Sequence, residues 1–430
     1  MQDQTSLSSL PRGAALIGQS GGPTAVINQS LVGVIEGLRM GLFASGHIDR
    51  ILGMRHGVKG LTKGEVVDCT AMHQDKLDNL ALTPSAALGS TRDKPDAAYC
   101  ERVLESCKKL KARYFFYIGG NDSSDTCRII SEMAQSTGYD MRCFHVPKTV
   151  DNDLMENDHT PGFPSAARFV AMACMADFMD NISLPGIKIN VVMGRHAGFL
   201  TGASALARRR DRALDDSVPT ASTDGPQLIY CPEVPFDMER FVADVDSIYS
   251  VKGRCHIVVS EGICDREGKP IAASLIKNGQ VDAHGNVQLS GSGALGDQLG
   301  DFLKAKLTPV GGKPPRVRAD TFGYVQRCWP DASIIDRIEA RRSGRFAATL
   351  ALQGHISGSV AIVRTGSGSA CYQPQGEAYA SDYKRVELSA IAAKTRHMPP
   401  EFLSGHNNVS RKFIEFCLPL VGELPGFERL

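Results

Sequence analysis

The chain has 430 residues, 42% of them hydrophobic, so it is long enough for two or three domains with separate cores. Its 48 Lys+Arg and 47 Asp+Glu give a net charge of +1, without the basic excess typical of nucleic-acid-binding proteins. The sequence contains no apolar stretch of the ~20 residues that a membrane span needs, and its start lacks the pattern of a secretory signal. We therefore expect a cytoplasmic protein without nucleic-acid or membrane partners. The 12 scattered cysteines form no CxxC pair and are expected to be reduced packing residues.

Short apolar runs alternate with helical patterns along the chain. Strand-like runs occupy residues 14–17, 114–118, 143–146, 187–193, 227–231 and 255–260, and helical spacing covers 165–179 and 236–249. This alternation predicts an α/β protein with mostly parallel sheets covered by helices on both faces. The polar stretch 211–225 is predicted to be a surface insertion, the run 308–315 a loop, and the break at 160–164 a domain boundary.

Loops with glycine or charge follow three of the early strands, at the strand ends where parallel sheets gather ligands. After the first strand, Gly21 and Gly22 precede a helical pattern. If the helix starts there, its backbone N–H groups and dipole suit a phosphate. An ordinary tight turn explains this motif equally well.

The other two loops carry more polar groups. The GGNDS motif at 119–123 combines flexible backbone with the oxygens of Asn121 and Asp122, which suit a hard cation. N-capping by Asp122 or Ser123 is the structural alternative. The PKTVDND motif at 147–153 places two carboxylates, an amide, a hydroxyl and an ammonium directly after an apolar strand. This costly concentration of polar groups indicates function rather than a charged turn.

Together with later motifs, these loops resemble the phosphofructokinase family, and specifically its pyrophosphate-dependent branch. The motifs, in chain order, are GGPT at 21–24 with Asn28, GGNDS, PKTVDND, MGR at 193–195 and YVQR at 324–327. The resemblance runs from about residue 14 to 337. It implies two Rossmann-like three-layer domains with the active site in the cleft between them. The implied domains are 1–160 plus about 326–380, which binds the donor, and about 161–325 plus 381–430, which binds the sugar phosphate.

Carried over residue by residue, the resemblance implies a donor, metal and catalytic site in the first domain. Asp151 would accept a proton from the acceptor hydroxyl, and Lys148 and Asp122 would lie beside the donor phosphates. The donor would also contact Gly22, Arg92, Gly120 and Ser123, and Mg²⁺ would lie at Asn121 and Asp153.

The implied contacts to fructose 6-phosphate come mostly from the second domain. Arg195 would neutralise the transferring group. Arg318 would reach the phosphate bound to a neighbouring subunit, which implies a homodimer or homotetramer. The remaining implied sugar-phosphate ligands are Thr149, Val150, Asp151, Met193, Gly194, Glu261, Tyr324 and Arg327.

Two positions bear on the choice of phosphoryl donor. ATP-using relatives carry glycine where Asp122 and Lys148 stand. The Asp122 carboxylate would repel the α-phosphate of ATP, whereas pyrophosphate has no third phosphate. We therefore expect a reversible pyrophosphate-dependent 6-phosphofructokinase. An ATP-dependent sugar-phosphate kinase and a non-catalytic regulatory subunit are the alternatives, and other acceptors, such as a seven-carbon sugar phosphate, stay open.

Three positions depart from the family pattern. Asn121 is neutral where many relatives have a metal-binding aspartate, so Mg²⁺ would depend more on Asp153, donor oxygens and water. Gly186 stands where ATP-dependent members have a second cross-subunit arginine, for which Lys188 is a candidate replacement. Tyr324 replaces a histidine and keeps a hydrogen-bond donor.

Other signals have simpler interpretations. The GxGxxG pattern at 291–296 lacks the acidic residue of a dinucleotide site and predicts a turn before a helix. Glu233 matches an effector-site position of regulated relatives and is left outside the catalytic set. Structural or solvent-facing roles are expected for four histidines near the motifs: His56, His145, His159 and His196.

Overall fold

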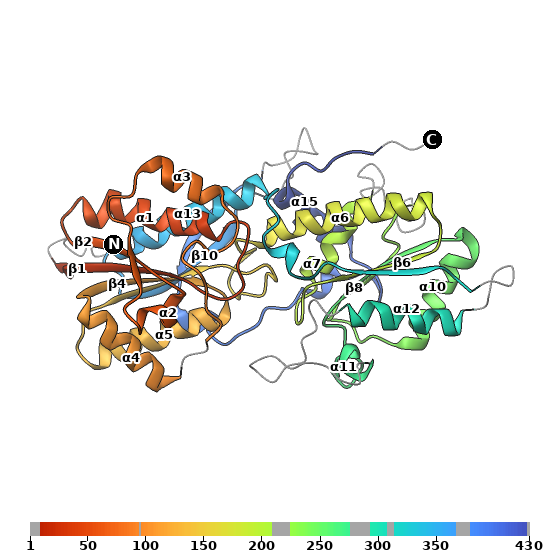
Figure 1. Cartoon of the computed structure of the whole chain (residues 1–430), viewed down its shortest axis with the longest axis horizontal. Coiled ribbons are helices and arrows are strands. Elements are labelled where there is room, and N and C mark those ends of the chain that lie inside the picture. Colours follow the sequence, from red (N-terminus) through yellow and green to blue (C-terminus); the bar gives the residue numbers. More distant parts are fainter. Residues whose placement is uncertain are drawn as a thin grey trace. The chain divides into compact units, whose positions relative to one another are not determined.

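The computed structural model describes residues 9–93, 96–208, 224–275, 293–307, 314–366 and 379–427. The chain divides into two compact units (Figure 1): Met1–Ser165 with Arg327–Arg396, and Ala166–Gln326 with His397–Leu430. The second unit resumes at His397 rather than near 381, because Ser381–Val386 is a strand of the first sheet. Most of the insertion predicted at 211–225, and most of the loop at 308–315, lie outside the described residues.

The first unit is built on a seven-stranded sheet with the order β11-β10-β5-β4-β1-β2-β3. The strands are β1 (Gly13–Gln19), β2 (Ile48–Met54), β3 (Val66–Asp68), β4 (Ala112–Gly119), β5 (Arg142–Pro147), β10 (Ser357–Arg364) and β11 (Ser381–Val386). The edge strands β3 and β11 are antiparallel to their neighbours, and the other pairs are parallel. The chain runs from β1 to β2 on one side and returns to β4 on the other. Open α/β sheets bind ligands beyond the carboxyl ends of their strands at such a reversal.

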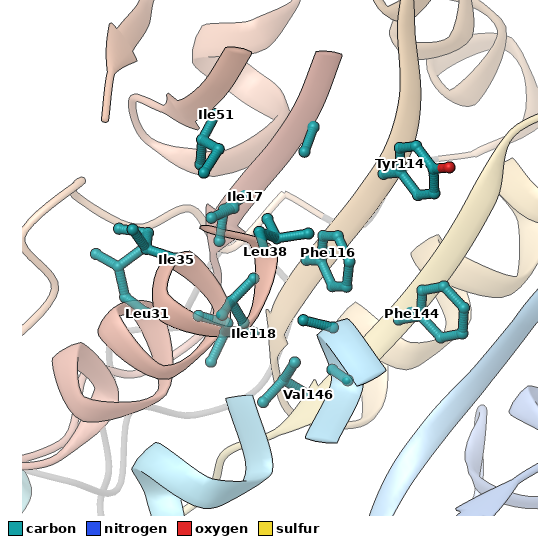
Figure 2. Packing of buried hydrophobic residues seen from close by; sticks show 14 of the residues in the cluster. Ile17, Leu31, Ile35, Leu38, Ile51, Tyr114, Phe116, Ile118, Phe144 and Val146 are labelled. Atoms are coloured by element: carbon teal, nitrogen blue, oxygen red, sulfur yellow. The ribbon is translucent and has the colours of Figure 1, made fainter. Parts of the chain in front are cut away.

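Helices cover both faces of this sheet (Figure 1), because its central strands are apolar on both sides and must be shielded from water on both. Tyr114, Phe116 and Ile118 of β4 pack toward one face, as Figure 2 shows, whereas Phe115 and Tyr117 pack toward the other. Burying each large apolar side chain contributes roughly 2 kcal/mol. The first face is covered by α1 (Ile27–Leu38), η2 (Arg39–Phe43), α3 (Gln74–Leu82) and α13 (Ile334–Leu352), and the second by α2 (Gly57–Leu61), α4 (Ala97–Lys109), α5 (Asn121–Ser136) and α14 (Leu388–Ile391). The predicted three-layer arrangement is confirmed for this unit.

Helices α1 and α13 cross at very short range. A Cβ on Gly33 would lie 2.0 Å from the Arg341 carbonyl oxygen, and one on Gly344 would lie 2.2 Å from the Ser30 carbonyl oxygen. Only glycine permits this approach. Beside the crossing, the buried Glu36 carboxylate accepts hydrogen bonds from Arg341 and Arg345 of α13. The position of α13 on α1 is therefore fixed by both backbone contact and charge.

We expect Glu36→Gln to lower the free energy of unfolding by about 1–3 kcal/mol at pH 7, because hydrogen bonds to a charged acceptor are lost. Burial opposes ionisation of Glu36, but bonds from the two arginines and Gln74 outweigh it and lower its pKa from 4.5 to about 2. The stabilisation is thus complete above pH 4.5 and is lost as the pH falls through about 2. Urea denaturation across this range checks the prediction, and a difference between wild type and variant that does not narrow in acid would contradict it. Glu132→Gln, which removes only an exposed pair with Arg128, serves as control.

The second unit contains a parallel four-stranded sheet with the order β7-β8-β6-β9. Its strands are β6 (Ile187–Val192), β7 (Leu228–Tyr230), β8 (Cys255–Ser260) and β9 (Val317–Thr321). Ile187, Ile189 and Val191 of β6 pack in the apolar core with α10 (Met238–Lys252) and α12 (Ala294–Lys306). Lys188 and Asn190, on the opposite face, bond to Asp177 of α6 (Phe163–Ser183). Among the residues that the structure describes, the remaining helices are α7 (Phe199–Ala203), η3 (Ser204–Ala207), α11 (Ile271–Leu275), η4 (Gly323–Arg327), η5 (Pro400–Phe402) and α15 (Arg411–Val421).

The α/β fold class, the predicted strands and both predicted helices are confirmed, with ends displaced by a few residues. Helix α12 starts at Ala294, after Gly293 in a left-handed conformation (φ 69°) that glycine adopts without steric cost. In the part of the chain that the structure describes, no helix is long and apolar enough to cross a membrane.

Candidate active site

The glycine loop after β1 is anchored to a neighbouring segment. The Gly21 N–H donates to the Thr91 carbonyl oxygen at 2.9 Å, and the Ser90 hydroxyl donates to the Gly21 carbonyl oxygen at 2.6 Å. Gly21 has a φ of 76°, which favours glycine. Helix α1 begins at Ile27, so the prediction that Gly21 and Gly22 start a helix is wrong. Pro23 and the turn that follows it intervene, so the phosphate-binding potential of this loop rests on its own N–H groups.

Two buried amides hold the same segment in place. Gln19 Nε2 donates to Asn28 Oδ1 at 2.9 Å, and Gln19 Oε1 accepts from the Leu88 N–H at 2.9 Å. Asn28 also donates to the Thr83 carbonyl oxygen at 2.8 Å. Asn28, part of the first motif, thus orders the segment that leads to Arg92.

The second loop leads directly into a helix. Gly120 is the N-cap of α5, without a side-chain cap bond, so N-capping by Asp122 or Ser123 is not observed. Ser123 is buried, and its Oγ lies 2.0 Å from where a Cβ on Gly119 would stand. Asp122 lies exposed in the first turn of α5. A carboxylate there offsets the positive helix end that would otherwise attract a phosphate.

Lys148 is a buried cation at this edge of the sheet. Its side chain is 3% exposed, and its Nζ donates to the Gly22 carbonyl oxygen at 2.6 Å. Burial, together with the positive charge of Arg327, lowers the Lys148 pKa from 10.5 to about 7, although the carboxylates of Asp153 and Asp151 oppose this shift. The ammonium therefore lies directly under the first glycine loop and titrates near neutral pH.

Thr149, near the start of the third loop, bonds to Thr160 and Pro161 at the end of the same loop. The Thr149 N–H donates to the Pro161 carbonyl oxygen at 3.1 Å, and the Thr149 carbonyl oxygen accepts from the Thr160 hydroxyl at 3.0 Å. The Thr149 hydroxyl in turn accepts from the Asp151 N–H at 3.1 Å. Val150, which lies between Thr149 and Asp151 in the chain, is buried. The backbone of Asp151 is therefore positioned by the closing residues of the loop.

The residues predicted to hold Mg²⁺ lie together. Asn121 Nδ2 donates to Asp153 Oδ2 at 3.1 Å. Asn121 Oδ1 is buried and accepts no hydrogen bond from the described residues. The two groups fit a hard cation that takes its other ligands from donor oxygens and water, as Mg²⁺ commonly does. Among the described residues, no cluster of three or more His, Cys, Asp or Glu could hold a metal by itself.

Two arginines border the donor loop. The Arg327 guanidinium carbon lies 3.0 Å from where a Cβ on Gly22 would stand, so Arg327, predicted as a sugar-phosphate ligand, lies against the donor loop. Arg92 is exposed and lines a hollow of about 460 Å³ with Lys59 and Lys63. Both arginines add positive charge around Lys148.

In the second unit, the MGR motif follows β6 directly. Gly194 has a φ of 134°, and its carbonyl oxygen accepts from the Ser260 hydroxyl. The buried Met193 donates its N–H to Gln326 Oε1 at 3.3 Å, which joins the MGR and YVQR motifs. Glu261 follows β8 and is also buried, with its N–H bonded to the Val192 carbonyl oxygen at 2.8 Å.

Three further residues of this unit that the sequence analysis named are Arg318, Lys188 and Tyr324. The Arg318 guanidinium pairs with Asp180 at 2.7 Å and donates to the Leu184 carbonyl oxygen. Lys188, the candidate for the arginine missing at Gly186, is buried and pairs with Asp177 and Asp320. Tyr324 is 48% exposed. Lys188 is therefore part of a structural ion-pair cluster with α6 and the neighbouring strand β9 of its own unit.

Sequence reasoning did not assign several groups that hold the site. Buried His145 bonds to Ser359 Oγ at 2.7 Å and to the Gly119 carbonyl oxygen at 2.9 Å, so it links the end of β4 to β10. Burial lowers its pKa to about 4, which keeps the ring neutral. Glu233 accepts from the Gly198 and Met398 N–H groups and borders a cavity of about 740 Å³ that Arg195 also lines. His145 has the structural role expected for it, although its partners were not predicted, and the sequence signals for Glu233 were its position after a strand and its match to an effector-site position.

A mostly parallel sheet whose order reversal carries glycine loops, a buried lysine and an asparagine–aspartate pair indicates an α/β enzyme of phosphorylated substrates. The chain belongs to the phosphofructokinase family, whose profile, described as Phosphofructokinase, matches residues 14–351. It is 47% identical over 422 residues, 97% of each chain, to pyrophosphate–fructose 6-phosphate 1-phosphotransferase of Rhodospirillum rubrum. The enzyme of the same name from Xanthomonas campestris is 32% identical, over 97% of this chain and 93% of the relative. The crystal structure of the pyrophosphate-dependent phosphofructokinase of Nitrosospira multiformis matches with a TM-score of 0.79 and 31% identity, over 97% of this chain and 94% of that chain.

Proposed function

We propose that this protein catalyses the reversible transfer of a phosphoryl group from pyrophosphate to the C1 hydroxyl of fructose 6-phosphate, giving fructose 1,6-bisphosphate and phosphate. The observation that carries the proposal is the Lys148 ammonium, buried under the Gly22 loop, with the Asp122 carboxylate at the start of α5. A buried cation there can neutralise a compact inorganic donor. The carboxylate disfavours the additional phosphate of a nucleotide. The names of the relatives from Rhodospirillum rubrum and Xanthomonas campestris support the same substrates.

The chemistry requires in-line placement of the reactants and neutralisation of charge more than covalent catalysis. Asp151 accepts the proton of the C1 hydroxyl as its oxygen attacks the transferring phosphorus, and phosphate leaves. Lys148, and Arg195 from the second unit, offset the negative charge that spreads over the phosphoryl oxygens. Asn121 and Asp153, together with donor oxygens, would hold Mg²⁺, which would supply further charge neutralisation.

A crossed assay tests this function. Purified protein is supplied with pyrophosphate or ATP, and with fructose 6-phosphate or sedoheptulose 7-phosphate, with and without Mg²⁺. We expect Mg²⁺-dependent turnover with pyrophosphate and fructose 6-phosphate in both directions, and very little with ATP. Efficient use of ATP by the wild type would contradict the donor assignment.

The pH dependence of donor binding tests the role of Lys148. Because the Lys148 pKa is lowered to about 7, its charge is present below that pH and is lost above it. We therefore expect the KM for pyrophosphate to rise as the pH increases through about 7. Lys148→Met keeps the bulk without the titration, so it reveals the part due to protonation of pyrophosphate itself. Equal pH profiles for the two proteins would contradict the prediction.

Assembly and location remain predictions. We propose a homo-oligomer in which Arg318 reaches the sugar phosphate of a neighbouring subunit, which requires the Arg318 guanidinium to exchange its ion pair with Asp180. We also propose a cytoplasmic location, as expected from the sequence.

A further inference from the structure

The loop that carries Asp151 ends in a buried cluster of charged side chains that the proposed chemistry does not use. His159, fully buried, lies between Asp158 and Glu339 of α13. Its Nδ1 is 2.8 Å from Asp158 Oδ2, and its Nε2 is 2.5 Å from Glu339 Oε2. The Tyr379 hydroxyl donates to the other Glu339 oxygen at 2.5 Å, and Arg364 of β10 pairs with Asp158 at 3.1 Å.

A second carboxylate of α13 holds the next residues of the chain. Asp336, one turn before Glu339, accepts from the Gly162 N–H at 2.9 Å and from the Ser165 N–H at 3.1 Å. The end of the loop is thus fastened to α13 at both His159 and Gly162. Since α13 is itself fixed on α1 through Gly33 and Gly344, the attachment is rigid.

The attachment continues to Asp151 through the backbone. Thr160 and Pro161, which follow His159, bond to Thr149, and the Thr149 hydroxyl accepts the Asp151 N–H. On the other side, Arg396 donates its N–H to the Asp153 carbonyl oxygen at 2.8 Å and its guanidinium to the Asp158 carbonyl oxygen at 2.7 Å. Hydrogen bonds and short backbone links therefore join the ion pair at His159 to the backbone N–H of Asp151.

We propose that the buried His159–Glu339 ion pair is a positioning device that fixes the carboxylate of Asp151 against the acceptor hydroxyl. This role rests on the proposed function, in which Asp151 takes the proton. A proton acceptor displaced by about 1 Å can lose a factor of 10² in rate, whereas the substrates still bind through other groups. Loss of the pair should therefore lower kcat with little change in KM.

The charge on His159 supports this role. Burial alone would lower its pKa, but Glu339 and Asp158 outweigh burial and raise it from 6.5 to about 9. The groups that face it are Asp158 on its own loop, Glu339 of α13 and the Tyr379 hydroxyl, with Arg364 and Arg396 behind Asp158. The imidazolium is present below about pH 9 and is lost above it.

Glu339→Gln tests the proposal because it removes the charge of Glu339 and keeps its shape. We expect kcat to fall 10- to 100-fold and both KM values to change little. In the wild type, kcat should decline as His159 loses its proton near pH 9, and in the variant this decline should move to lower pH. Glu339→Asp, which keeps the charge, should restore part of kcat. His159→Gln provides a second variant if Glu339→Gln folds poorly. Glu36→Gln is the matched control, because it removes another buried carboxylate bonded to α13 but leaves the backbone contacts of α13 at Gly33 and Gly344 in place. The Glu36 carboxylate bonds to Arg341, Arg345 and Gln74, none of which belongs to the loop that carries Asp151.

Amide hydrogen exchange tests the positioning role independently of the proposed function, because the measurement needs no substrate or turnover. We expect faster exchange at the Thr149 and Asp151 amides in Glu339→Gln, and wild-type exchange there in Glu36→Gln. Unchanged exchange at these amides, or a kcat no lower than that of Glu36→Gln, would overturn the positioning role. An inactive wild type, or an Asp151→Ala enzyme with normal turnover, would instead overturn the proposed function and leave the exchange result to decide whether the pair orders the loop.

Discussion

Asp151→Ala is expected to lower kcat by about 10²–10⁴-fold, the range that a positioned general base contributes. Fructose 6-phosphate should bind almost as well as to the wild type, because its phosphate is held by other groups. The loop should also keep its shape, since Thr149 bonds to the Asp151 N–H and not to its carboxylate. Steady-state rates with pyrophosphate, together with calorimetric binding of fructose 6-phosphate, measure both effects.

Asp151→Asn provides the isosteric control, because it keeps the size of the side chain and removes its basicity. If Asn restored most of the rate, the carboxylate would act by orientation and not by proton transfer. If the alanine enzyme kept most of its turnover, Asp151 would not be the base. A regulatory, non-catalytic chain would show no rate in any variant, including the wild type.

The double change Asp122→Gly with Lys148→Gly is expected to shift the ratio of kcat/KM for ATP to that for pyrophosphate by on the order of 10²-fold or more. Asp122 lies exposed in the first turn of α5, so its removal restores a positive helix end to an incoming phosphate. Loss of Lys148 removes the ammonium under the Gly22 loop. The two donors are compared at saturating fructose 6-phosphate.

The single variants separate the two causes. Asp122→Gly alone should raise activity with ATP, and Lys148→Gly alone should mainly reduce activity with pyrophosphate. Lys148→Met removes the charge but fills the space beneath the loop, so it shows whether the Gly22 loop needs packing as well as charge. If both single variants left donor preference unchanged, the choice of donor would lie outside these two positions.

Local patterns predicted the strands that carry the site and the loops that follow them, but they gave no run for β2, β3, β10 or β11. The runs around β4 and β5 are apolar over most of their length, as strands buried on both faces must be, and their ends place Asn121 and Lys148 at the same sheet edge. The contact of Asn121 with Asp153 and the burial of Lys148 agree with that reading. The helical spacing that begins at Ile27 coincides with the start of α1, but Pro23 and a turn separate Gly21 and Gly22 from that start.

Long-range pairings could not be predicted in the same way. His159 and Glu339 are 180 positions apart, and only the crossing of α13 over α1 brings them together. Arg318 and Lys188 were assigned by resemblance to phosphate contacts, yet each finds a carboxylate on α6, Asp180 and Asp177. A charge seen in a sequence does not reveal which opposite charge the topology will place beside it.

The interleaving of the two units has a consequence for synthesis on the ribosome. Residues up to Ser165 form five of the seven strands of the first sheet, but the helix that covers α1 and the strand that flanks β5 are translated much later. Until Arg364 has emerged, the apolar side of α1 and one edge of β5 stay uncovered. The first unit of a nascent chain therefore stays partly folded while residues Ala166–Gln326 are translated. During this interval its unpaired strand edge favours aggregation and offers a binding surface to chaperones.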